Sequence, residues 1–166
     1  MDLTNQMPIA TKSSKFDISK ESDTAKIAKE VSKKIKKGDI LFFFGEIGVG
    51  KTTFIKYLIN NLQKINKVKL TEVPSPTFNL LYEYDVKSLK IMHYDLYRLK
   101  TNKEIEQLGI FEDSSNILSI IEWPEKMEKK NNNRLEIAFY YESDEESRKL
   151  KIQGFGKWKN FKLNGI

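Results

Sequence analysis

The segment GEIGVGKT, residues 45–52, matches the pattern G-x-x-x-x-G-K-[ST] and is the most informative part of this 166-residue chain. In this pattern the glycines let the backbone curl so that successive N–H groups face phosphate oxygens. Lys51 would reach the β- and γ-phosphates, and the hydroxyl of Thr52 would ligate Mg²⁺. The segment therefore predicts a binding site for a nucleoside triphosphate.

The residues on either side provide the context that this chemistry requires. Ile40–Phe44 is a continuous apolar run, which is typical of a strand buried on both faces. Residues 51–64 carry apolar side chains at helical spacing, so an amphipathic helix should begin directly after the glycines. The positive end of that helix would add to the attraction for phosphate. This order of strand, glycine-rich loop and helix favours a nucleotide site over a simple connecting turn.

Further from this segment, the apolar periodicity predicts alternating helices and strands. Before it we expect a short edge strand at 15–18 and a helix at 21–37, capped by Ser19 or Ser22 and ended by Gly38. After it we expect strands at 80–84, 89–94 and 117–121, a short helix at 102–108, and an antiparallel hairpin from 135–141 and 148–153. The order predicts a three-layer α/β fold like that of P-loop NTPases, with a mainly parallel sheet and antiparallel additions. Residues 1–166 should form a single domain, with residues 1–13 frayed.

The composition excludes several kinds of site. The chain has no cysteine, which rules out disulfides, thiolate nucleophiles and iron–sulfur clusters, and its one histidine rules out a multi-histidine metal site within the chain. No apolar run is long enough to span a membrane and no export signal opens the sequence, so we expect a cytoplasmic protein. The net charge of +6 could attract nucleic acid, but only three of the basic residues are arginines. We therefore interpret the charge as a solvated basic surface.

The sequence favours adenine over guanine nucleotides. GTP-specific proteins normally read the base with an N-K-x-D motif. The two Asn-Lys pairs, at 66–67 and 102–103, are not followed by the aspartate that would bond guanine. No D-x-x-G follows the phosphate loop either, so we expect ATP to be the nucleotide.

Two acidic residues end predicted strands, where the catalytic groups of a parallel sheet gather. Asp95 could hold Mg²⁺ through water or hydrogen-bond Thr52, and the alternative is a turn or helix cap. Glu122 could ligate the metal, or orient or deprotonate a water molecule for attack on the γ-phosphate. A solvated acid is the alternative for Glu122, and we favour the functional role. His93 lies within a strand and is predicted to be a packed, hydrogen-bonded residue.

Five segments resemble the TsaE family in their order and spacing. They are GEIGVGKTT at 45–53, SPTF at 75–78, HYDLYRL at 93–99, EQLG at 106–109 and IEWPE at 121–125. The resemblance runs from about Glu21 to Arg148. The phosphate loop is generic, whereas the combination of S-P-T-F, H-x-D-L-Y-R and E-W-P is specific to this family of small bacterial ATPases, which are needed to make threonylcarbamoyladenosine on tRNA.

The resemblance implies a function that the residues alone do not. It implies a protein that binds ATP with Mg²⁺, hydrolyses it weakly, and associates with a TsaB–TsaD pair whose TsaD member performs the transfer. Nucleotide turnover would reset that complex between cycles. The tRNA would be contacted at most indirectly, through the complex.

The resemblance also implies roles for individual residues. The nucleotide would contact the phosphate loop, the region of Trp123, and positions before the first helix and in the C-terminal hairpin: Ile47, Gly48, Val49, Gly50, Lys51, Thr52, Thr53, Trp123, Glu21 and Arg148. Lys51, Asp95 and Glu122 would act in catalysis, with Asp95 as an essential Walker-B-like acid. Thr52 and Glu122 would hold Mg²⁺. Residues 75–78 would form a switch-like loop that senses the nucleotide.

Three other functions remain as alternatives. The first is a small-molecule kinase, because residues 95–98 loosely resemble the acid-plus-arginine motif of nucleoside kinases; such kinases usually use several arginines, and only Arg98 lies near the site motifs. The second is a nucleotide-gated scaffold without significant turnover. The third is a direct RNA binder, which rests on charge alone because the sequence carries no RNA-binding signature.

Overall fold

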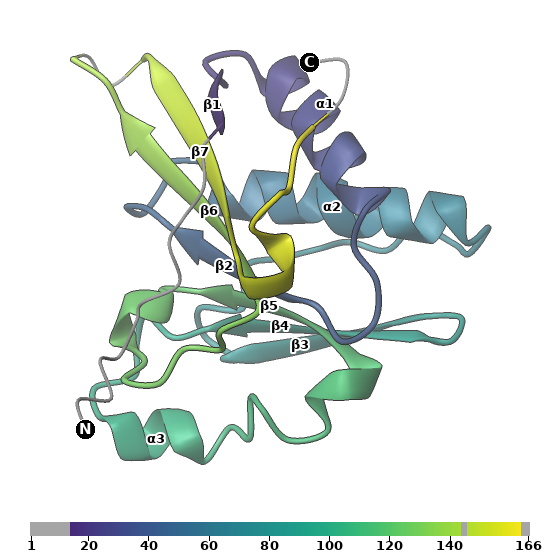
Figure 1. Ribbon diagram of the computed structural model, residues 1–166, viewed down its shortest axis with the longest axis vertical. Coiled ribbons are helices and arrows are strands. Elements are labelled where there is room, and N and C mark those ends of the chain that lie inside the picture. Colours follow the sequence, from purple (N-terminus) through teal and green to yellow (C-terminus); the bar gives the residue numbers. More distant parts are fainter. Residues whose placement is uncertain (1–13, 144–145, 164–166) are drawn as a thin grey trace, which may run out of the picture.

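The computed structural model describes residues 14–143 and 146–163, so the expectation for residues 1–13 lies outside the described residues. Its centre is a seven-stranded sheet with the order β1-β7-β6-β2-β5-β4-β3 (Figure 1). The strands are β1 (Ser14–Asp17), β2 (Ile40–Phe44), β3 (Leu81–Val86), β4 (Leu89–Asp95), β5 (Ile117–Glu122), β6 (Arg134–Tyr141) and β7 (Arg148–Phe155). Strands β6, β2, β5 and β4 run parallel to one another, while β7, β1 and β3 join by antiparallel pairing. The predicted mainly parallel sheet with a C-terminal hairpin is confirmed.

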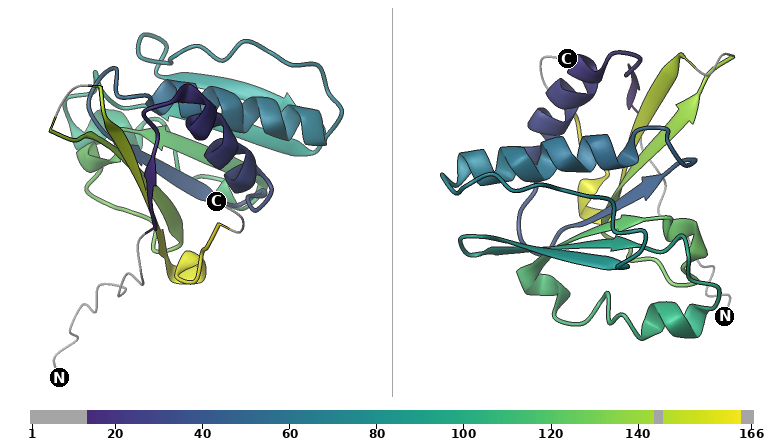
Figure 2. Two further views of the ribbon diagram at one scale, coloured as in Figure 1. Left: turned by 90° about the horizontal axis from the view of Figure 1, so that it is seen from above. Right: turned by 180° about the vertical axis from the view of Figure 1, so that it is seen from behind.

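Helices cover both faces of this sheet. Helices α1 (Glu21–Ser32) and α2 (Lys51–Ile65) pack against each other on one face, and α3 (Asn102–Glu106) lies on the other side (Figures 1 and 2). The described residues also form three short 3₁₀ helices: η1 (Ser114–Asn116) precedes β5, η2 (Pro124–Lys126) connects β5 to β6, and η3 (Gly156–Trp158) follows β7. The predicted three-layer α/β architecture is therefore confirmed.

The apolar run of β2 divides between two hydrophobic clusters, one on each face of the sheet. Leu41 and Phe43 pack in the cluster that includes α1 and α2. Ile40 and Phe42 pack in the cluster that includes α3. Because successive strand residues point to opposite faces, a central strand with both faces covered needs apolar side chains throughout. Truncation of a buried phenylalanine to alanine costs about 3–5 kcal/mol, so β2 is a main anchor of the fold.

Helix α1 begins at Glu21 as predicted, but its C-terminal end and its N-cap differ from the prediction. It ends at Ser32 rather than near residue 37, because the chain must then turn into β2: the Lys36 N–H donates to the Asp39 carboxylate at 2.7 Å, and Gly38 has φ +84°. At the other end the N-cap is Lys20, with no side-chain cap hydrogen bond. The hydroxyl of Ser19 instead accepts the N–H of Arg148 at 3.1 Å, which ties the start of α1 to β7. Within the described ranges, every helix is too short or too polar to cross a bilayer.

Candidate nucleotide-binding site

The glycine-rich loop, residues 45–50, leads directly from the end of β2 into α2. Gly45 has φ +138°, and a Cβ there would lie 2.8 Å from the Phe139 carbonyl oxygen and 2.9 Å from a methyl group of Val49. Only glycine fits both this backbone conformation and this space. Gly50, with φ +117°, is the residue immediately before α2 and has open space around its Cα. The two glycines therefore let the loop curl tightly between β2 and α2.

Lys51 lies at the inner side of this loop and is 5% exposed. Its Nζ donates hydrogen bonds to the carbonyl oxygens of Gly45 and Glu46, the latter at 3.0 Å. The ammonium group is also 4.4 Å from the centre of the Trp123 ring. Burial lowers the pKa of Lys51, while the charges of nearby carboxylates, Glu122 foremost, oppose that effect. A cation is thus held beside the N-terminus of α2, where phosphate oxygens are attracted.

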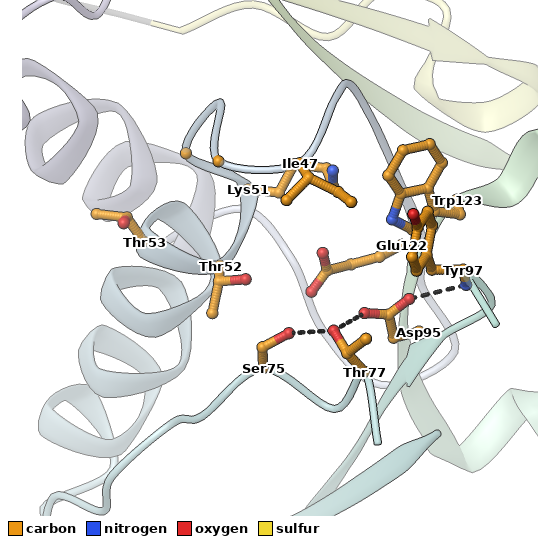
Figure 3. A pocket seen from close by; sticks show the side chains of 12 residues that line it. Ile47, Lys51, Thr52, Thr53, Ser75, Thr77, Asp95, Tyr97, Glu122 and Trp123 are labelled. Carbon is orange, nitrogen blue, oxygen red and sulfur yellow. Dashed lines mark hydrogen bonds between the residues drawn. The ribbon is translucent and has the colours of Figure 1, made fainter. Parts of the chain in front are cut away.

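Asp95 and Glu122 form the wall opposite this loop. They end β4 and β5, which are parallel neighbours, and the two residues are direct register partners. Their exposed fractions are 2% and 3%. Because both strands end at the same edge of the sheet, the two carboxylates face the start of α2 together, as the sequence predicts (Figure 3).

Asp95 is hydrogen-bonded to the segment 75–78, which the sequence suggested as a switch-like loop. The hydroxyl of Thr77 donates to one carboxylate oxygen at 2.8 Å, and the N–H of Tyr97 donates to the other at 2.9 Å. Ser75 extends this chain through a hydroxyl–hydroxyl bond of 2.8 Å to Thr77 (Figure 3). The hydrogen bond to Thr52 considered from the sequence is absent among the described residues. Thr77 takes the place of Thr52 as a partner of Asp95.

Glu122 is bonded to the interior of the sheet instead. One of its carboxylate oxygens lies 2.8 Å from Nε2 of His93, which is fully buried. The prediction that His93 is a packed, hydrogen-bonded residue is thus confirmed. The sequence did not identify Glu122 as its partner.

An aromatic pair closes one side of the site. Trp123 directly follows Glu122 with a left-handed backbone, φ +60°, and its ring centre is 4.9 Å from that of Tyr97. Lys126 donates to the carbonyl oxygens of Tyr97 and Leu99, the latter at 2.8 Å. The segments that follow β4 and β5 are therefore held together beside Lys51.

These groups line one cleft, which gathers most of the site residues predicted from the sequence. Its lining is Ile47, Gly48, Gly50, Lys51, Thr52, Thr53, Ser75, Thr77, Asp95, Tyr97, Glu122 and Trp123. Thr77 and Tyr97 carried no individual prediction, although both stand inside motifs that suggested the site. Their positions in S-P-T-F and next to the strand-end acid were the available signal.

Three predicted nucleotide contacts lie outside the lining of this cleft. Val49 is buried in the hydrophobic core. Glu21, at the start of α1, accepts the hydroxyl of Tyr57 at 2.6 Å. Arg148 lies over the ring of Tyr141, 5.6 Å from its centre. Glu21 and Arg148 can reach a ligand only where it extends beyond the phosphate loop.

The donor set of the cleft suits Mg²⁺ better than a metal that needs a full protein cage. Within residues 14–143 and 146–163, no three side chains of histidine, aspartate, glutamate or cysteine gather as a metal cluster. Mg²⁺ keeps several waters and usually binds one or two carboxylates together with substrate phosphates. Thr52, Glu122 and a nucleotide would supply such a set.

The strand, the glycine-rich loop, the helix and the two acids at adjacent strand ends define a P-loop NTPase-like protein. Residues 18–150 match the family model described as Threonylcarbamoyl adenosine biosynthesis protein TsaE. The chain belongs to the TsaE family, which confirms the resemblance seen in its motifs.

Individual relatives agree with this assignment. The tRNA threonylcarbamoyladenosine biosynthesis protein TsaE of Rickettsia felis is 41% identical over 108 residues, which is 65% of this chain and 61% of that protein. The chain thus spans about three-fifths of that relative's length. The protein of the same name from Aquifex aeolicus is 36% identical over 132 residues, 80% of this chain and 90% of that protein. The crystal structure of Bacillus subtilis YdiB matches with a TM-score of 0.66 and 25% identity, covering 90% of this chain and 89% of that one.

Proposed function

We propose that this protein binds ATP with Mg²⁺ in the cleft, hydrolyses it slowly, and supports threonylcarbamoyladenosine formation on tRNA as an accessory subunit. The observation that carries the proposal is the position of Lys51. Its cation lies inside the phosphate loop, at the start of α2, and faces the two strand-end acids. The names of its TsaE relatives supply the pathway.

The residues would divide the work between binding and positioning. The loop N–H groups and the N-terminus of α2 would receive the phosphates, and Lys51 would exchange its carbonyl partners for phosphate oxygens. Thr52 and Glu122 would hold Mg²⁺, which when bound neutralises phosphate charge. Asp95 would keep residues 75–78 against the site through Thr77. Phosphoryl transfer needs mainly this positioning and charge stabilisation.

Calorimetric titration with ATP and GTP, each with Mg²⁺, tests the nucleotide site. We expect ATP to bind more tightly than GTP, and Lys51→Ala to weaken ATP binding by roughly tenfold to a hundredfold, because it removes a charge-assisted contact worth about 1.5–3 kcal/mol. Lys56→Ala is the matched control, since Lys56 is an exposed lysine on the same helix. An unchanged affinity in Lys51→Ala, or tighter binding of GTP, would contradict this part of the proposal.

The partner in this proposal is a TsaB–TsaD-type complex, through which tRNA would be contacted indirectly. The chain has three arginines, and each guanidinium lies over an aromatic ring: Arg98 over Phe78, Arg134 over Phe155 and Arg148 over Tyr141. Arg98 is exposed, Arg134 and Arg148 lie on β6 and β7, and the lining of the cleft contains no arginine, which favours a catalytic charge supplied from outside the chain. Such a supplied arginine accelerates phosphoryl transfer by about 10³–10⁵ in related systems, and positioning of a general base alone gives about 10²–10⁴.

Phosphate release, measured with and without the purified partner pair, tests this activation. We expect very slow turnover by the isolated chain and a large acceleration by the pair. Rapid turnover by the isolated chain, unchanged by the pair, would favour an autonomous ATPase. Phosphate transfer to an added small-molecule acceptor would instead favour a kinase.

A further inference from the structure

His93 is the only histidine of the chain, and its place in the site is unusual. It lies on β4, two residues before Asp95, and its side chain is fully buried. Its Nε2 is 2.8 Å from a carboxylate oxygen of Glu122 on the neighbouring strand. Its other ring nitrogen, Nδ1, has no hydrogen-bond partner in the part of the chain that the structure describes. The imidazole therefore directs its one polar contact at a residue of the nucleotide cleft.

The strand register explains how the two side chains meet. In the parallel β4–β5 pair, His93 is opposite Ile120 and Asp95 is opposite Glu122. Residues two apart on a strand point to the same face, so His93 lies on the face that carries Asp95. The carboxylate of Glu122 meets His93 across the strands. Because an ionised carboxylate only accepts, the ring proton of this bond belongs on Nε2.

We propose that His93 is a positioning residue that orients Glu122 for Mg²⁺. The imidazole holds one carboxylate oxygen of Glu122 from the side of the sheet interior, which leaves the other oxygen free to face the cleft. Figure 3 shows this carboxylate extending toward the start of α2. The inference rests on the proposed nucleotide function and adds a residue to it. Partners that hydrogen-bond a metal ligand from behind set its orientation, and their loss lowers metal affinity about 10–100-fold.

A purely structural role fits the position of His93 less well. An apolar side chain would fill the same interior without leaving a polar nitrogen unpaired, which is costly in a buried environment. The hydrogen bond to Glu122 is the one interaction that an apolar residue could not provide. The imidazole thus serves the carboxylate rather than the packing of the sheet.

Two amide variants of different reach provide the test. His93→Gln places an NH₂ group near the position of Nε2, whereas His93→Asn is shorter and cannot reach Glu122. The measured quantity is the magnesium gain, the ratio of ATP affinities with Mg²⁺ and with a chelator. We expect His93→Asn to lower the magnesium gain about 10–100-fold and His93→Gln to retain most of it. Melting temperatures of both variants are measured in parallel.

A double-mutant cycle with Glu122→Gln separates positioning from packing. If His93 acts through Glu122, His93→Asn should cause little further loss of magnesium gain in the Glu122→Gln background. The proposal is overturned if the magnesium gain of His93→Asn equals that of the wild type, or if both amide variants lose it equally. It is also overturned if the losses caused by His93→Asn and Glu122→Gln add in the double mutant. If instead the wild-type protein shows no magnesium-dependent ATP binding, it is the proposed function that fails.

Discussion

Asp95 and Glu122 are equivalent in position and different in attachment. Both end parallel neighbouring strands, both are almost fully buried, and the two are register partners. Asp95, however, accepts hydrogen bonds from Thr77 and from the backbone of Tyr97, both in connecting segments. Glu122 accepts from His93, which lies within β4.

This difference indicates two roles for two similar acids. A carboxylate bonded to connecting segments can transmit a change in its ligand to those segments. A carboxylate bonded to a buried strand residue is held in place and can act as a fixed ligand. We therefore expect substitution at the two positions to affect different measurements.

The largest effect is expected from Glu122→Gln, which removes the charge and keeps an oxygen that can accept from His93. The magnesium gain in ATP affinity should fall roughly tenfold to a hundredfold, because a charged metal ligand is lost. Asp95→Asn is the matched comparison and should lower the magnesium gain less. Calorimetry with Mg²⁺ and with a chelator measures both variants. A larger loss in Asp95→Asn would reverse the roles that we assign.

A smaller effect is expected from Thr77→Val, which removes the hydroxyl bonded to Asp95 and keeps a similar shape. Hydrogen bonds to charged groups contribute about 1.5 kcal/mol or more, so amide exchange in residues 75–80 should accelerate roughly tenfold. The magnesium gain should stay unchanged, because Glu122 keeps its own partner. Ser75→Ala is the control, since it leaves the bond between Thr77 and Asp95 intact. Unaltered exchange in Thr77→Val would show that this bond does not hold the segment.

The features that were predictable from the sequence are those set by local pattern. The apolar run of β2, the glycine-rich loop and the helical spacing of α2 identified the central unit, because each depends on residues adjacent in the chain. The placing of Asp95 and Glu122 at one sheet edge followed from a general property of parallel strands.

The unpredicted features depend on contacts between distant segments. The bond from His93 to Glu122 requires the register of β4 against β5, which periodicity does not reveal. Thr77 can be recognised as a partner of Asp95 only once the path of residues 75–78 across the site is known. Helix α1 ended early because of a turn held by Asp39, although its apolar spacing continues to Ile35, which is buried outside the helix.

The smallest effect concerns β3, the edge strand that pairs with β4, and tests whether the sheet next to Asp95 affects either acid. Tyr84 on β3 faces Ile91 of β4, and its buried hydroxyl has no hydrogen-bond partner within residues 14–143 and 146–163. Tyr84→Phe removes this unpaired group, so it should raise the free energy of unfolding at pH 7 by up to about 1 kcal/mol. The magnesium gain and the exchange of residues 75–80 should not change. A change in either would show that this part of the sheet contributes to the difference between Asp95 and Glu122.

The pH dependence of Tyr84→Phe gives the second part of this prediction. Burial, with a smaller effect from Tyr82, raises the pKa of Tyr84 from 10.0 to about 12. The folded state therefore favours the neutral phenol. Ionisation of Tyr84 lowers the free energy of unfolding as the pH rises from 10 through 12, and below pH 10 this loss is absent. At about pH 11 the wild type should have lost about 1 kcal/mol that Tyr84→Phe retains. Urea unfolding of both proteins between pH 8 and about pH 11 measures this difference, and parallel curves would contradict the shift.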